Sequence, residues 1–332
     1  AAVVFCAWLQ SWWLRLFFAM ALIQIVWHGP VITAYVDLLM IAIFMAAIQG
    51  FSRIDPAAIK SMMRVAAYLL IGWMILQAAG PADSGGLGPA AAGPFNIDAG
   101  SAFIAMCLPA FWHGRRWPWA IPVALGLVGC HATTGFLAAF AATATFAALR
   151  LRGKWRIGCG VGILIAALMF FKWIDPISGV WSNDRWHSWH RVVQSYESAP
   201  LGRGLGSFGD IFPLLTASDA ELHQTDGKKI IGPTWQHAHN EYLQTGFEMG
   251  MPAAALLIVF VGYIFSRAWL RRESLTADDA IALSGFAATA VAAAGFHIFH
   301  IAPTALLGCA WIGCVENIGR QGAHARFKEG VL

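Results

Sequence analysis

The sequence predicts an all-α membrane protein that crosses the bilayer about ten times and carries one large loop on the outer side. Composition supports this fold class: 58% of the residues are hydrophobic, only 12% are charged, and mean hydropathy is +0.60. Soluble domains usually hold about twice that charged share. The net charge of +4 is interpreted as a sign of membrane orientation, so it does not imply a nucleic-acid partner. We expect residues 1–332 to form a single membrane domain.

Apolar runs long enough, or nearly long enough, to cross a bilayer recur along the whole chain. They occupy residues 12–27, 31–50, 65–79, 97–112, 117–130, 134–149, 157–173, 252–269, 280–298 and 301–318. The runs at 117–130 and 134–149 are the shortest, and Pro118, Pro122 and Gly135 interrupt them. Because the chain begins with Ala1 and lacks a cleavable signal pattern, we expect its natural N-terminus to lie upstream.

Basic residues are concentrated in alternate connections between these runs. They are Arg53, Lys60 and Arg64; Arg115 and Arg116; Arg150, Arg152, Lys154 and Arg156; Arg267, Arg271 and Arg272; and Arg320, Arg326 and Lys328. The intervening connections at 80–96, 131–133 and 299–300 contain no lysine or arginine. The positive-inside rule therefore predicts that the basic loops and both termini face the cytoplasm.

The connection at residues 172–251 is predicted to lie outside, and it is unusually long for a compact protein. It holds several basic residues, which outer loops normally lack, so we expect it to be functional. Its tryptophans, at 173, 181, 186, 189 and 235, favour a loop that lies along the headgroup layer. We therefore place the active site in this loop.

The most informative stretch is residues 235–253, where polar residues directly precede an apolar run. At helical spacing Glu241, Gln244, Thr245 and Glu248 share one face, while Leu243, Phe247 and Gly250 take the other. This pattern predicts a short amphipathic helix at the bilayer surface. Asn240 is its expected N-cap, which would hold His239 just outside the helix and facing a substrate.

The pair His239-Asn240, followed after nine residues by Gly250, resembles the signature of the O-antigen ligase and O-antigen polymerase superfamily. The chain departs from it at Ala253, where relatives often carry a second small or polar residue. A second stretch from Ser182 to Phe208 resembles the superfamily's run of serine, arginine, tryptophan, proline and alternating glycines.

Weaker matches extend the resemblance to about residues 90–265. Gly93-Pro94-Phe95-Asn96 resembles a segment that precedes a membrane helix in relatives, whereas Thr133-Thr134-Gly135 replaces their serine and arginine before a glycine. The role of that missing arginine is vacant or passes to Arg191 or Arg203. Cys6, Cys107, Cys130, Cys159, Cys309 and Cys314 show no Cys-x-x-Cys pair. His187, His190, His223 and His237 repeat no known metal-ligand spacing, so we expect neither metal nor cofactor.

The resemblance implies a multi-pass glycosyltransferase of the bacterial inner membrane whose active site faces the periplasm. It would move an oligosaccharide or polysaccharide from undecaprenyl diphosphate to an acceptor hydroxyl, without metal. His239 would act as general base or orient the acceptor. Arg185 would stabilise the departing diphosphate, because its planar fork matches phosphate oxygens. Arg203, Arg191, Asn240 and Trp189 are the expected substrate-binding residues.

Several alternatives stay open. The acceptor would be another carrier-linked glycan for a polymerase, the lipid A core for a ligase, or a protein for an O-oligosaccharyltransferase of the same superfamily. Arg185 would otherwise be a surface residue that pairs with lipid headgroups or with Glu197. The alternative from another class is a polysaccharide or lipid transporter, in which His297, His300 and Glu316 would line a permeation path.

Overall fold

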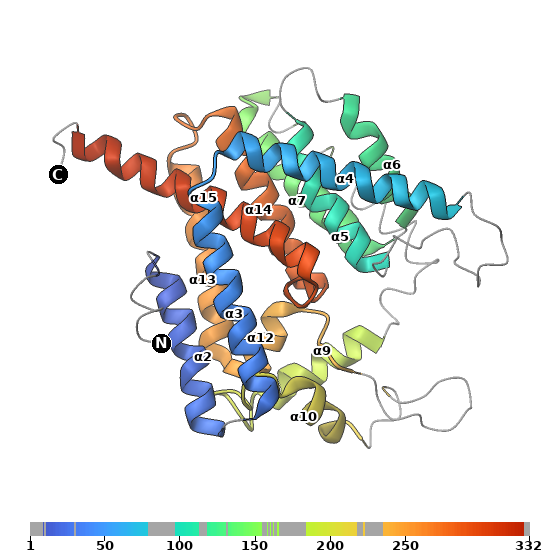
Figure 1. Cartoon of the computed structure of the whole chain (residues 1–332), viewed down its shortest axis with the longest axis vertical. Coiled ribbons are helices and arrows are strands. Elements are labelled where there is room, and N and C mark those ends of the chain that lie inside the picture. The colour runs from blue at the N-terminus through green and yellow to red at the C-terminus, as the bar shows by residue number, and fades with distance from the viewer. Residues whose placement is uncertain are drawn as a thin grey trace. The chain divides into compact units, whose positions relative to one another are not determined.

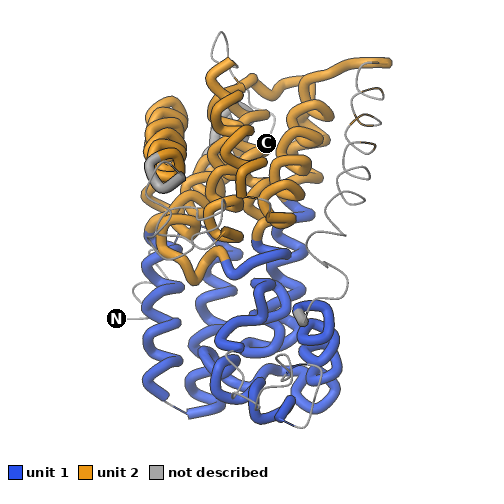
Figure 2. The backbone as a smooth tube through the Cα atoms, turned by 90° about the vertical axis from the view of Figure 1, so that its right-hand side faces the viewer, with its two compact units in different colours: residues 1–46, 179–263, 293–297 blue, residues 47–178, 264–292, 298–332 orange. Residues whose placement is uncertain are grey.

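The predicted all-α class is confirmed for the part of the chain that the structure describes. The computed structural model (Figure 1) describes residues 9, 11–29, 31–78, 97–112, 118–130, 132–154, 184–217, 222 and 235–328, with isolated positions between 158 and 165. Helices and no strands occur within these ranges. The chain divides into two compact units, which are described separately and coloured in Figure 2.

The first unit comprises residues 1–46, 179–263 and 293–297. It contains α2 (Trp12–His28), most of α3 (Ile32–Phe51), α9 (Asp184–Ser195), α10 (Phe208–Leu215), α12 (Glu241–Met249) and most of α13 (Met251–Leu270). Small buried residues, Ala21, Ala34 and Ala253, share one apolar cluster with Leu205 and Met249. Small side chains let helix backbones approach closely where lipid provides no hydrophobic driving force.

The long loop has an apolar core of its own within this first unit. Val192, Phe208, Phe212 and Phe247 are at most 1% exposed and pack in one cluster with Ala238. The rings of Phe208 and Phe212 stack at 4.7 Å. This core joins α9, α10 and α12, each of which is too short to be stable alone. The expectation that loop tryptophans face the headgroups is therefore incomplete: Trp186 is exposed, but Trp189 and Trp235 are partly buried.

The second unit comprises residues 47–178, 264–292 and 298–332. Its helices are α4 (Pro56–Ala78), α5 (Ile97–Cys107), η1 (Leu108–Phe111), α6 (Ala120–Cys130), α7 (Thr133–Arg150), most of α14 (Ala277–Gly295), η3 (Ile298–His300) and α15 (Ala302–Lys328). Helix α5 is central, because α4, α6, α7 and α15 all contact it. Its residues 99–107 are buried on every side, as expected of an all-round apolar helix.

Glycine explains the close approach of α7 to α5 in the second unit. A Cβ atom at Gly135 would lie 2.5 Å from Cβ of Ser101 and 2.7 Å from its carbonyl carbon. Within the stretch Thr133-Thr134-Gly135, the glycine therefore has a packing role. Nearby, the indole nitrogen of Trp311 donates a hydrogen bond to the carbonyl oxygen of Met106 at 2.8 Å, which links α15 to the end of α5.

Four described helices are long and apolar enough to cross a membrane, namely Ile32–Phe51, Pro56–Ile75, Met251–Leu270 and Ala277–Gly295. Four other expected spans are shorter apolar helices, at Trp12–His28, Ile97–Phe111, Ala120–Cys130 and Ala302–Glu316. The expected span at 134–149 corresponds to α7, and the one at 157–173 lies almost entirely outside the described residues. Membrane character is supported, and the count of ten spans stays a prediction.

Candidate active site

Helix α12 begins where the sequence predicts, and Asn240 is its N-cap. The side-chain oxygen Oδ1 of Asn240 accepts hydrogen bonds from the backbone N–H groups of Tyr242 at 3.0 Å and Leu243 at 3.1 Å. These N–H groups have no partner within the helix, so the cap satisfies both of them. The cap also fixes the direction in which the chain enters α12, and thereby the position of His239.

His239 has a strained backbone conformation immediately before this cap. Its φ angle is +52°, and within the described ranges no other non-glycine residue has a positive φ. This left-handed conformation costs an ordinary side chain about 1–2 kcal/mol, so the surrounding structure must enforce it. Backbone strain of this kind is concentrated at functional sites.

The imidazole of His239 lies in a cluster of aromatic rings within the first unit. His297 follows α14 and is nearest, with its ring centroid 4.6 Å from that of His239 in an edge-to-face arrangement. The ring of His237 stacks on that of His297, with the centroids 4.5 Å apart. Phe296 and Trp235 lie 5.6 Å and 6.3 Å from the His239 ring. His297 was expected only as a transporter residue, and nothing in the local sequence indicates that it meets His239.

The polar face of α12 is buried, which corrects the expectation that it lies against a surface. Glu241, Gln244 and Glu248 are 7%, 4% and 5% exposed. Gln244 donates from Nε2 to Oε1 of Glu248 at 3.1 Å, and its Oε1 accepts from the backbone N–H of Ala238 at 3.1 Å. Spacing alone cannot separate a polar face in water from one that forms a polar network in a core.

The glycine-rich segment 200–206 closes the C-terminal end of α12. The backbone N–H groups of Arg203 and Gly204 donate to the carbonyl oxygens of Phe247 at 2.9 Å and Glu248 at 3.0 Å. The N–H of Gly206 donates to Oε2 of Glu248 at 3.1 Å. A helix leaves its last carbonyls without intrahelical partners, and this segment satisfies two of them. The backbone N–H groups of Gly204 and Gly206 are therefore bonded to α12.

Gly250 ends α12 at φ +91°, and its role is steric. A Cβ atom there would lie 2.5 Å from the carbonyl carbon of Leu201. Gly202 has φ +94°, and a Cβ atom added to it would lie 2.6 Å from the backbone nitrogen of Gly250. The N–H of Met251 then donates to the carbonyl oxygen of Pro200 at 2.9 Å. The two glycines let two backbone segments touch directly.

The arginine of that segment also has structural contacts. The Nη2 atom of Arg203 donates to the carbonyl oxygen of Ser195 at 3.1 Å and to Oγ of Ser198 at 2.7 Å. Its guanidinium lies 5.5 Å from the centroid of the Phe247 ring. Arg203 thus caps the last turn of α9 and covers the loop core, and its role in binding the donor stays a prediction.

Helix α9 brings Trp189 to the backbone beside His239. The indole nitrogen of Trp189 donates to the carbonyl oxygen of Ala238 at 2.7 Å. Arg185 lies one helical turn before Trp189, so both side chains emerge from the same face of α9. Arg191 is exposed and donates to Oε1 of Gln194 on its own helix at 3.1 Å. The structure therefore associates Arg185, and not Arg191, with the face that meets the His239 segment.

Two partly buried tyrosines, Tyr242 of α12 and Tyr196 just after α9, lie in the same unit. Burial, and secondarily the charge of Glu241, raise the pKa of Tyr242 to about 12. Burial also raises the pKa of Tyr196, whose hydroxyl donates to the carbonyl oxygen of Leu243 at 2.9 Å. Both phenols are protonated at neutral pH. Among the described residues no three His, Cys, Asp or Glu side chains gather as metal ligands, and His223 lies outside those residues.

Comparison with known proteins agrees with the resemblance inferred from the sequence. The family model described as O-Antigen ligase matches residues 118–258, a stretch that includes α9, α12 and the segment between them. No curated protein matches the chain. The matched stretch contains both His239 and Arg185.

Proposed function

We propose, from the premise that residues 118–258 belong to the O-antigen ligase family, that this chain is a membrane glycosyltransferase of the bacterial inner membrane. Its donor is an oligosaccharide or polysaccharide on undecaprenyl diphosphate, and its acceptor is a hydroxyl of a glycan or of the lipid A core. Transfer takes place at the periplasmic face. The strained backbone of His239, inside the matched region and next to an N-cap, is the observation that carries this proposal.

In this mechanism His239 removes the proton from the acceptor hydroxyl, since a neutral imidazole is a competent base near neutral pH. The acceptor oxygen forms a bond to the anomeric carbon, and the bond from that carbon to the diphosphate oxygen breaks. Undecaprenyl diphosphate leaves with the bonding electrons. Arg185 binds the two phosphates through its planar guanidinium, which stabilises the negative charge that develops there.

In this proposal the other site residues hold the backbone and the ring of His239 in position. Trp189 and Asn240 hold the segment that carries His239, through the carbonyl of Ala238 and the first turn of α12. His297 and Phe296 fill the space beside the imidazole. Each contact restricts the orientation of His239, and precise orientation is worth several powers of ten in rate.

The test substitutes asparagine for His239, because asparagine tolerates a left-handed backbone better than alanine does and is not a base. His239→Asn should fold like the wild type and lose about 10²–10⁴-fold in transfer rate. Purified protein in detergent would be given undecaprenyl diphosphate-linked glycan and an acceptor, and released undecaprenyl diphosphate would be measured.

The matched control is His190→Asn, an exposed histidine on α9. His237 is unsuitable as a control, because it belongs to the same ring cluster as His239. Wild-type transfer by His239→Asn would remove this residue from the chemistry. If wild-type protein transferred nothing but moved the lipid across vesicle membranes, the transferase proposal would fail and a transporter would replace it.

A further inference from the structure

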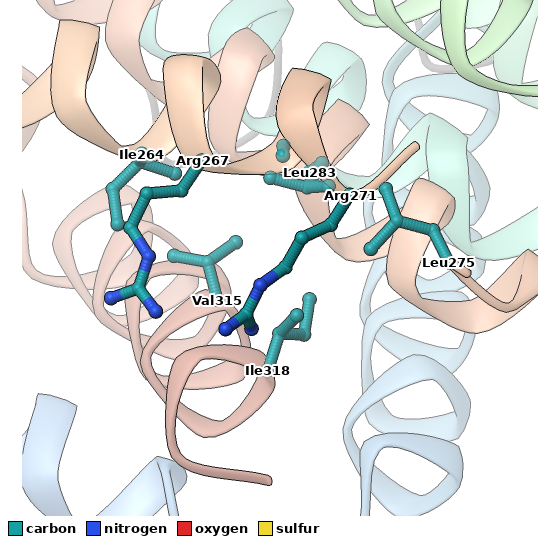
Figure 3. A pocket seen from close by; sticks show the side chains of 8 residues that line it. Ile264, Arg267, Arg271, Leu275, Leu283, Val315 and Ile318 are labelled. Atoms are coloured by element: carbon teal, nitrogen blue, oxygen red, sulfur yellow. The ribbon is translucent and has the colours of Figure 1, made fainter. Parts of the chain in front are cut away.

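A hollow in the second unit combines two arginines with an otherwise apolar lining (Figure 3). Its lining residues are Arg267 and Arg271, with Ile264, Ala268, Leu275, Leu283, Val315 and Ile318. Its empty volume, including the part open to solvent, is about 360 Å³. Only about 40 Å³ of it is accessible to water-sized molecules, which is well below the range for small-molecule sites and suits a single phosphate group better than a whole lipid.

The two arginines line the same hollow from consecutive turns at the end of α13. Arg267 lies in the last turn of α13, and Arg271 follows it by one turn, with its backbone N–H donating to the carbonyl oxygen of Arg267 at 3.2 Å. Figure 3 shows both side chains extending in the same direction, with Val315 between them. Residues four positions apart in a helical turn are neighbours on one face, so both side chains can reach one anion. Guanidinium groups match phosphate oxygens in particular.

The surroundings of this hollow favour a position at the level of lipid headgroups. It lies at the end of α13, a helix long and apolar enough to span a membrane. Trp269 and Leu270, which end that helix, are 46% and 81% exposed. An exposed tryptophan beside arginines at a helix end is typical of a bilayer interface. Arg150 lies close by as well, because it donates to the carbonyl oxygen of Leu275 at 3.3 Å.

We propose that this hollow binds the phosphate of an anionic phospholipid, with the first carbons of the lipid against Ile264 and Val315. A free phosphate would use only the arginines and would leave the apolar lining unused. No acidic residue lines the hollow among those the structure describes, so the lining itself favours an anion. The alternation of basic loops predicts that this end of α13 faces the cytoplasm, where anionic lipids carry negative surface potential.

The experiment counts lipids bound to the purified full chain by native mass spectrometry. The probes are phosphatidylglycerol, phosphatidylcholine and inorganic phosphate. The wild type should retain phosphatidylglycerol in preference to phosphatidylcholine, and inorganic phosphate should not displace it. The double variant R267Q/R271Q should weaken phosphatidylglycerol binding by about ten-fold or more, because it loses two charged hydrogen-bonding groups.

Arg272→Gln is the matched control, because Arg272 lies at the same helix end but contacts Trp269, at 4.9 Å from its ring, and does not line the hollow. It should bind phosphatidylglycerol within about two-fold of wild type, since general surface charge contributes little. If R267Q/R271Q does not elute from a size-exclusion column like wild type, R267K/R271K takes its place. The lysines keep both charges but lack the planar guanidinium that binds phosphate through two hydrogen bonds, so weaker binding of phosphatidylglycerol is still expected. Equal binding by wild type and variant, equal retention of both lipids, or displacement by phosphate would each overturn the proposal.

Discussion

Substituting alanine for Gly250 tests whether the end of α12 and the segment 200–206 are one structural unit. Gly250 has φ +91° and ψ +163°, a region that essentially only glycine occupies, and forcing another residue into it costs about 1–3 kcal/mol. The added Cβ would also lie 2.5–2.8 Å from three backbone atoms of Leu201, so that backbone must move.

The movement has further consequences that can be estimated. It disturbs the hydrogen bond from Met251 N–H to the carbonyl oxygen of Pro200, at 2.9 Å. It also disturbs the bond from Nε2 of Gln24 to the carbonyl oxygen of Leu201, at 2.8 Å. Each is worth about 1 kcal/mol, so Gly250→Ala should lower the free energy of unfolding by about 3–5 kcal/mol in total.

Gly262→Ala is the matched control for this measurement. Gly262 lies in the same first unit, within α13, and a Cβ atom there meets nothing within 4 Å. Alanine is the better helix former by about 1 kcal/mol, so this variant should be as stable as wild type or slightly more so. Unfolding of the detergent-solubilised proteins, followed by size-exclusion chromatography after heating, compares the two. If Gly250→Ala unfolds at the wild-type temperature, the backbone contact between 201 and 250 does not exist.

Two further substitutions probe α12. Asn240→Ala should lower the free energy of unfolding by about 1 kcal/mol, because the N–H groups of Tyr242 and Leu243 lose their cap. Asn240→Asp keeps a capping oxygen and should unfold like wild type. An equal loss of stability in both variants would contradict the cap. Tyr242, with a pKa of about 12 against an ordinary 10.0, keeps its proton in the folded state where the unfolded chain releases it. Stability should therefore be complete below pH 10 and fall by about 2–3 kcal/mol as pH rises to 12, a loss that Tyr242→Phe should reduce in an alkaline unfolding titration.

Local sequence patterns predict the local parts of this structure. Asn240 before a polar and apolar alternation is enough to place the start of α12, because capping and helical spacing depend on neighbours in the chain. The apolar runs likewise predict helices, because their residues favour burial or lipid. These features agree with the structure to within a residue or two at α12 and α13.

Contacts between distant residues could not be predicted in the same way. His297 joins His239 from 58 positions further along the chain; only the fold brings them together. Glu241 and Glu248 are spaced along α12 as on a helix that faces solvent. In the structure they are buried, and the carboxylate of Glu248 accepts hydrogen bonds from the backbone of Gly206 and the side chain of Gln244. The family resemblance predicts Arg203 as a substrate-binding residue, and only the fold shows that it also bonds to the end of α9.

The three residues that carry the family resemblance, His239, Asn240 and Gly250, have different roles in the structure. Gly250 has no side chain to react, and the oxygen of Asn240 is committed to the start of α12. His239 alone carries a side chain that can act as a base, and it is also the residue at positive φ. Substitutions at Gly250 should therefore lower transfer only as far as they unfold the protein, whereas Asn240→Ala should also lower it by releasing the segment that carries His239. His239→Asn should lower transfer while the free energy of unfolding stays unchanged, because of these three residues only His239 has a side chain that can act as a base.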